Sequence, residues 1–254
     1  MLEKTQGIVL RTLKYNDESV IVDIYTANNG AQGFIVRLPR SRKSPVRSIL
    51  LRPLSILNLE YDYRPHRSLQ FLRNMQVAEP YHSLPYEPLK ETVGLFLSEF
   101  LYYALKNEER NPPLFQYLKN GLLWFDEAQR AVANFHLVFL IRLTRFLGFW
   151  PDIAPEAGSP RKNASRTRYS GVFDLREGVM TDIVPLHSAW LSPEESALAP
   201  LLLRMDFHTM HLFRLNREQR RRILDVLTDY YRLHVPEFPE LKSLEILKEV
   251  VGGN

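Results

Sequence analysis

A basic segment between two predicted strands contains the residues whose chemistry is easiest to interpret in this sequence. No acidic residue occurs from Arg37 to Arg52, whereas six cations do. Guanidinium and ammonium groups that neutralise phosphates release condensed counterions, so such a segment binds a nucleic-acid backbone with an affinity that falls with salt and ignores base sequence. We therefore predict a phosphate-binding, DNA-binding surface formed by Arg37, Arg40, Arg42, Lys43, Arg47 and Arg52.

The positive charge of the chain is concentrated in its first eighty residues, which hold twelve Lys or Arg against seven Asp or Glu. The formal net charge of the whole chain is only +4, so the remainder contributes none of this surplus. Aromatic side chains in the same region, including Tyr15, Tyr25, Phe34, Tyr61, Tyr63 and Phe71, offer faces on which unpaired bases stack. Because side chains alternate along a strand, most of these aromatics are expected to fill a core.

Other kinds of chemistry find little support in the sequence. Cysteine is absent, which excludes disulfides, thiol nucleophiles and thiolate metal sites. His208 and His211 have no third ligand at a suitable spacing, and neither a Gly-rich phosphate loop nor a Gly-x-Ser-x-Gly elbow occurs. We expect no catalytic residue, no metal and no cofactor.

The elements that position the basic segment are predicted to be short strands. Turn residues such as Asn16-Asp17 and Asn28-Asn29-Gly30 separate apolar runs with visible alternation. Five short strands within about eighty residues favour a small barrel such as the OB-fold over an open sheet with exposed edges. The expected strands are Ile8 to Leu13, Ser19 to Tyr25, Gly33 to Leu38, Ser55 to Tyr61 and Ser68 to Val77.

Helical periodicity replaces alternation after Pro80, so the fold class expected is α+β, with strands first and helices after them. Domains are predicted over residues 1–80 and 81–254, with a loop or hairpin insertion at 152–191 that pairs Phe173 to Leu175 with Val179 to Ile183. Gly148 is expected to end one helix, and Ser192 with Glu195 to cap another. Helices are expected from about Pro88 to Lys106, from Pro112, from Glu127 to Leu147, from Ser192 and from Asn216.

The order of several short motifs resembles the bacterial RecO family of DNA repair proteins. Each motif is weak alone, but together they span nearly the whole chain in the family's order. They are Gly7 to Thr12, Tyr15 to Ser19, Tyr25-Thr26 with Gly30, Arg40 to Ser44, Leu51 to Leu54, Pro113 to Phe115, Phe139 to Leu143, Leu147 to Pro151 and Leu241 to Leu244.

The resemblance implies an OB-fold followed by a helical domain in a cytoplasmic, nucleoid-associated protein without enzymatic turnover. It implies binding to single- and double-stranded DNA, strand annealing, and action with RecR to load RecA on DNA coated by single-stranded-DNA-binding protein. Arg11 and Lys14 are expected to extend the DNA track. For the acidic C-terminal tail of the single-stranded-DNA-binding protein, Arg142 and Arg145 are the expected cations, beside a hydrophobic pocket for its terminal aromatic.

The sequence departs from the family's pattern at two places. Many relatives carry a four-cysteine zinc module in the region that matches 152–191, so here we expect no zinc and a hairpin held by packing alone. Relatives often have glycine after the basic strand, where this chain has Leu38-Pro39, so we expect the geometry of the DNA-binding loop to differ from theirs.

Three other functions remain open from sequence. A protein-interaction scaffold needs only the helical region, and an RNA-binding protein would use the same barrel. A hydrolase would need an acid–base pair that is distant in sequence. The salt dependence of DNA binding, with and without Arg40, Arg42 and Lys43, separates these alternatives.

Overall fold

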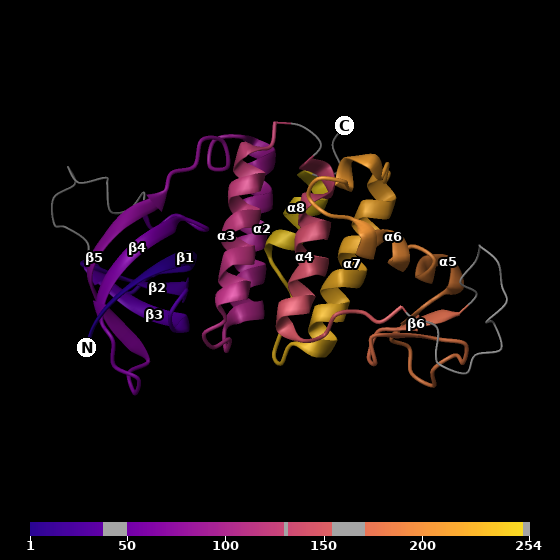
Figure 1. The fold of residues 1–254 in the computed structure, drawn as a ribbon, viewed down its shortest axis with the longest axis horizontal. Helices are drawn as coiled ribbons and strands as arrows, with labels where there is room; N and C mark the ends of the chain where they lie inside the picture. The colour runs from indigo at the N-terminus through magenta and orange to yellow at the C-terminus, as the bar shows by residue number, and fades with distance from the viewer. Residues whose placement is uncertain (38–49, 130–131, 154–170, 251–254) are drawn as a thin grey trace. The chain divides into compact units, whose positions relative to one another are not determined.

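The computed structural model describes residues 1–37, 50–129, 132–153 and 171–250 (Figure 1). The chain divides into two compact units. The first comprises residues 1–129 and 239–254, and the second comprises residues 130–238. The predicted domain limits at residue 80 stay a prediction, because a compact unit and a functional domain need not share a boundary. No helix within the described ranges is long and apolar enough to cross a membrane.

The first unit begins with a closed five-stranded barrel in the order β1-β2-β3-β5-β4, which confirms the predicted OB-like fold. All neighbouring strands are antiparallel except β3 and β5, which pair in parallel over Gly33–Ile35 and Leu69–Phe71. Its interior is filled by Val9, Val22, Ile24, Phe34, Leu59 and Tyr61, among others. The strands are β1 (Leu2–Lys14), β2 (Ser19–Thr26), β3 (Gly30–Arg37), β4 (Ile56–Asp62) and β5 (Leu69–Glu79).

In the described part of the first unit, three helices are added to the barrel: α2 (Pro88–Leu105), α3 (Pro112–Glu127) and α8 (Ser243–Val250). α2 packs against β1 and against α8. The hydroxyl of Ser98 in α2 donates to the carbonyl of Leu10, and Glu99 accepts from the backbone N–H groups of Lys242 and Ser243. These contacts fix the helices to one side of the barrel.

The second unit combines helices with a small three-stranded sheet. Tyr231 of α7 donates from its hydroxyl to the carbonyl of Leu140 in α4, which joins the two longest helices of this unit. Gly148 ends α4 in a left-handed conformation, and Ser192 and Glu195 form a capping box, as predicted. The elements are η1 (Val132–Asn134), α4 (Phe135–Leu147), β6 (Val172–Asp174), β7 (Val179–Thr181), β8 (Trp190–Leu191), α5 (Pro193–Ser196), α6 (Ala199–Arg204), η2 (Met210–Leu212) and α7 (Arg217–His234).

The predicted hairpin is present as β6 and β7, and β8 pairs with β6 on its other side. We expected apolar packing alone to hold this hairpin, and that expectation was wrong. Asp174 accepts from the backbone N–H groups of Arg176 and Glu177 at the turn, and its other oxygen lies 3.2 Å from His187 Nε2. A hydrogen-bonded carboxylate therefore adds to the apolar cluster around Phe173 in holding this sheet together.

The largest differences between predicted and observed boundaries are at the starts of β1 and α4. β1 begins at Leu2 rather than Ile8, because its polar first half pairs with β4 from Leu2↔Asp62 onward. The helix predicted from Glu127 begins at Phe135, since Glu127 is the last residue of α3 and Ala128 has an extended backbone.

Candidate nucleic-acid interface

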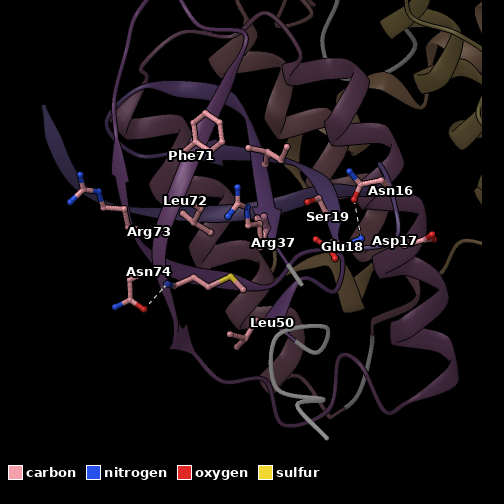
Figure 2. Close-up of a pocket in the computed structure, with 13 residues that line it drawn as sticks. Asn16, Asp17, Glu18, Ser19, Arg37, Leu50, Phe71, Leu72, Arg73 and Asn74 are labelled. Carbon is pink, nitrogen blue, oxygen red and sulfur yellow. Dashed lines mark hydrogen bonds between the residues drawn. The ribbon is translucent and has the colours of Figure 1, made fainter. Parts of the chain in front are cut away.

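A groove lies on the barrel between the end of β3 and residues 71–75 of β5, beside the turn that joins β1 to β2. Figure 2 shows Arg37 between Phe71 and Arg73 on one side and the Asn16–Ser19 turn on the other. OB-folds commonly bind oligonucleotides on the face of β2 and β3 and on the flanking loops. The groove is lined by Asn16, Asp17, Glu18, Ser19, Ile35, Val36, Arg37, Leu50, Phe71, Leu72, Arg73, Asn74 and Met75.

The outer face of the barrel next to this groove carries a continuous apolar row across four strands. Leu13 pairs with Ile21, Ile21 with Ile35, and Ile35 with Phe71. Directly paired residues place their side chains on the same face of a sheet. Leu13 and Phe71, at the two ends of the row, are 42% and 50% exposed. The row therefore presents apolar surface to solvent rather than to the barrel core.

One border of the apolar row is occupied by an ion-pair cluster. Arg11 Nε lies 2.9 Å from Asp23 Oδ2, its Nη2 donates to the Tyr102 hydroxyl, and its guanidinium lies 3.6 Å from the centroid of the Tyr102 ring. Tyr102 belongs to α2, so the helix closes this border. Arg11, which we predicted to contact DNA, is thus already engaged by an acid and an aromatic ring.

The other predicted cations are distributed unequally. Arg37 is exposed at the end of β3 and lines the groove. Lys14 lies at the end of β1, where its Nζ is 2.8 Å from Asp17, a residue of the groove. Arg52 is exposed but lines a different depression, with Tyr81 and Tyr86. Arg40, Arg42, Lys43 and Arg47 lie outside the described residues.

The described lining of the groove is close to neutral. Asp17 and Glu18 oppose Arg37 and Arg73, and Arg73 is paired through Nε and Nη2 with Asp62 at 2.7 and 2.6 Å. Most of the positive charge available for phosphates therefore belongs to residues 38–49, which contain four cations and no acid. Both residues that flank this segment in the structure, Arg37 and Leu50, line the groove.

The loop between β4 and β5 adds residues that our sequence analysis did not select. Gln70 is 1% exposed, and its side-chain amide accepts from the backbone N–H of Arg64 and donates to the carbonyls of Arg64 and Arg67. Arg67 is exposed, and its guanidinium lies 5.5 Å from the centroid of the Phe71 ring. The signal was available as three arginines, at 64, 67 and 73, around one predicted turn.

The second unit contains the two cations predicted for a partner's acidic tail, Arg142 and Arg145 of α4. Arg142 Nε donates to the carbonyl of Met205, and the exposed Arg145 lies with its guanidinium 4.2 Å from the centroid of the Trp150 ring. In the same unit, a predominantly apolar pocket is lined by residues of α4, α6 and α7, including Ile141, Leu202, Ile223 and Leu227.

A buried histidine of α4 in the second unit, His136, is excluded as an acid or base for a substrate. Burial, together with the charge of Arg220, lowers the pKa of His136 to about 3, so this imidazole is neutral at physiological pH. It is 1% exposed and therefore inaccessible to a substrate. Within the parts of the chain that the structure describes, no group of three or more His, Asp or Glu is arranged to hold a metal ion.

Comparison with known proteins gives consistent matches along the chain. Residues 1–81 match the family model described as Recombination protein O N terminal, and residues 86–245 match Recombination protein O C terminal. The chain is 48% identical over 250 residues to the DNA repair protein RecO of Phocaeicola vulgatus, covering 98% of this chain and 99% of that protein. It is 46% identical to the same protein of Bacteroides fragilis (98% and 99% covered) and 33% identical to that of Flavobacterium psychrophilum (97% and 98% covered).

Proposed function

The chain belongs to the RecO family of DNA repair proteins, and we propose that it acts by binding single- and double-stranded DNA along its barrel. The observation that carries this proposal is the position of the basic segment. Arg37 and Leu50, the described residues on either side of residues 38–49, both line a groove beside the face that OB-folds use for oligonucleotides. Residues 38–49, which hold four of the cations, are therefore connected at both ends to a surface suited to a DNA strand.

Phosphate contacts from the basic segment account for affinity in this proposal. Arg37 and Lys14 extend the contacts along the groove, and Arg40, Arg42, Lys43 and Arg47 supply most of the charge. Arg52 adds a cation at the C-terminal end of the segment. Arg11 adds positive electrostatic potential at the border of the apolar row on the barrel. Such binding is electrostatic, so it is strongest at low salt and tolerates any base sequence.

Strand annealing follows from the same charge. Two complementary strands repel each other through their phosphates, and a cationic surface that holds one strand screens this repulsion for the second. We propose that the protein anneals strands in this way and, with RecR, helps to load RecA on DNA coated by single-stranded-DNA-binding protein. No step in this function breaks or forms a covalent bond, so the protein acts without turnover and without a cofactor.

The second unit is proposed to bind the C-terminal tail of the single-stranded-DNA-binding protein. An acidic tail that ends in an aromatic residue needs cations beside an apolar pocket. Arg142 and Arg145 of α4 supply cations, and the pocket around Ile141 and Leu202 supplies apolar surface within the same unit. Arg222, paired with Glu195 at 2.5 Å, lines the same pocket.

Titration of the purified protein against DNA and RNA of equal length and sequence tests the proposal. We expect fluorescence anisotropy to report binding to single-stranded and duplex DNA. The slope of log affinity against log salt concentration should correspond to the neutralisation of several phosphates. The same protein is expected to accelerate annealing of complementary oligonucleotides. Tighter binding to RNA at equal salt would favour the RNA-binding alternative, and absence of DNA binding would favour the scaffold. Hydrolysis of a nucleotide or ester would contradict the non-enzymatic function.

A further inference from the structure

We propose that Phe71 and Arg67 form a subsite that stacks an unpaired base of single-stranded DNA on the outer face of the barrel. This inference rests on the proposed DNA-binding function and adds to it a site that distinguishes unpaired strands from duplex. The basic segment does not make that distinction, because phosphates are present in both forms of DNA.

The position of Phe71 in the sheet is the first observation behind this subsite. Its neighbours in β5, Gln70 and Leu72, face the barrel interior, so Phe71 points outward and stays 50% exposed. Its cross-strand partner is Ile35, which continues the apolar row toward Ile21. One face of a base stacked on the Phe71 ring would therefore rest on aromatic and aliphatic surface.

The second observation is the cation beside this ring. The Arg67 guanidinium lies 5.5 Å from the Phe71 centroid, within the range of a cation–π contact. A planar guanidinium also stacks on bases and binds phosphates through its N–H groups. Arg73 lies on the same side of the groove as Phe71, and Arg37 lies next to them in the groove. A nucleotide with its base on Phe71 thus has cations within reach of its phosphate.

The third observation is the support of the loop that carries Arg67. Gln70 makes three hydrogen bonds to the backbone of Arg64 and Arg67, at 2.9–3.1 Å, from a position that is almost completely buried. A turn hydrogen bond from the N–H of Arg67 to the carbonyl of Arg64 closes the same loop. Gln70 is therefore a positioning residue, and the loop is ordered before DNA arrives, which lowers the entropy cost of binding.

Duplex DNA is not expected to use this subsite. Its bases are paired and stacked on each other, so their faces are unavailable to an aromatic side chain unless the helix opens. Removal of the Phe71 ring should consequently weaken binding to single strands and leave duplex binding unchanged. Since no charge is lost, the salt dependence should also be unchanged.

The test compares wild-type protein with Phe71→Ala and Phe71→Tyr on a fluorescein-labelled oligo(dT) of about 15 nucleotides, close to the upper length that one OB-fold covers. Two further probes have the same length: an oligonucleotide of abasic sites and a duplex. We expect Phe71→Ala to bind oligo(dT) about tenfold more weakly, with Phe71→Tyr close to wild type. On the abasic strand and on the duplex, wild type and Phe71→Ala should bind equally.

Leu95→Ala is the control, because Leu95 of α2 is also an apolar side chain of the first unit with nearly the same exposure, 51%, and does not line this groove. It should bind all three probes as wild type does. Equal oligo(dT) binding by wild type and Phe71→Ala would overturn the stacking subsite while leaving the proposed function intact. A loss that is as large on the abasic strand or on the duplex would overturn the stacking subsite in the same way. Failure of the wild-type protein to bind any DNA would overturn both.

Discussion

Asp126→Ala is expected to lower the free energy of unfolding of the first unit by about 3–5 kcal/mol. The Asp126 carboxylate accepts from the backbone N–H groups of His82, Ser83 and Leu84 at 2.6–2.8 Å. It thereby ties the end of α3 to the loop that leads from the barrel into α2. Alanine would leave three donors without their acceptor, in a region where water has little access.

Lys90 increases the cost of this substitution. It is 2% exposed, and its Nζ donates to Ser83 Oγ at 2.6 Å and to the Asp126 carbonyl at 2.8 Å, while Glu87 lies 3.8 Å away. Displacement of the Ser83 loop by this substitution would take one of the two hydrogen-bond acceptors away from a buried ammonium. Chemical denaturation followed by circular dichroism measures the change. Asp17→Ala, at an exposed ion pair, is the control and should cost less than about 0.5 kcal/mol.

The pH dependence provides a further check on Asp126. Burial by itself would raise the pKa of this carboxyl, but the hydrogen bonds from His82, Leu84 and Ser83 outweigh it and lower the pKa below its ordinary value. A carboxyl whose folded pKa is depressed stabilises the protein above the unfolded pKa and loses that contribution as pH falls through the folded pKa. The stability difference between wild type and Asp126→Asn should therefore narrow as the pH falls below about 4. A difference that is constant with pH would contradict this role.

Gly30→Ala is expected to lower the stability of the first unit by about 2–4 kcal/mol. Gly30 has a φ of +63°, and a Cβ at this position would lie 2.3 Å from the carbonyl oxygen of Glu108. The turn between β2 and β3 packs here against the loop that follows α2, where Ala31 N–H donates to the Glu108 carbonyl at 3.0 Å. A methyl group would push this loop away and break that hydrogen bond.

Gly148→Ala separates the two causes of the destabilisation expected for Gly30→Ala, which are the positive φ and the steric contact with Glu108. Gly148 also has a positive φ, +86°, but a Cβ there would meet no atom within 4 Å. Its substitution should cost only the backbone term of about 1 kcal/mol. The measurement is the denaturant concentration at the unfolding midpoint of both variants. The slope of the unfolding free energy against denaturant concentration should be unchanged. Equal effects of the two substitutions would mean that the contact with Glu108 contributes nothing.

Local patterns in the sequence predicted most of the fold. Alternation and turn residues identified the five strands, and helix caps such as Gly148 and Ser192 were found where expected. The start of β1 was missed because residues 2–6 are mostly polar, and only their pairing with β4 makes them a strand. The start of α4 was missed because apolar periodicity does not reveal that α3 continues to Glu127 and that the backbone becomes extended at Ala128.

The candidate site was predicted only in part, for a related reason. Charge counting finds a basic segment without knowledge of three-dimensional neighbours, since its residues are adjacent in sequence. Phe71 and Ile35 become neighbours only through the parallel register of β3 and β5, and the support that Gln70 gives to Arg67 depends on the closed barrel. Arg11 was predicted to contact DNA, but the structure pairs it with Tyr102, which lies 91 residues farther along the chain and could not be foreseen from sequence. Long-range pairing therefore decides which residues share a surface.

The measurement that tests the central claim most directly is the salt dependence of single-stranded DNA binding after Arg40, Arg42 and Lys43 are all replaced by alanine. We expect the slope of log affinity against log salt to fall in magnitude by about 2–3, with affinity reduced roughly 10- to 100-fold near physiological salt. A triple variant of Arg204, Arg214 and Arg217, exposed residues of the second unit, removes the same charge and should bind like wild type. Unchanged affinity and slope in the first variant, or equal losses in both, would contradict DNA binding through the basic segment of the barrel.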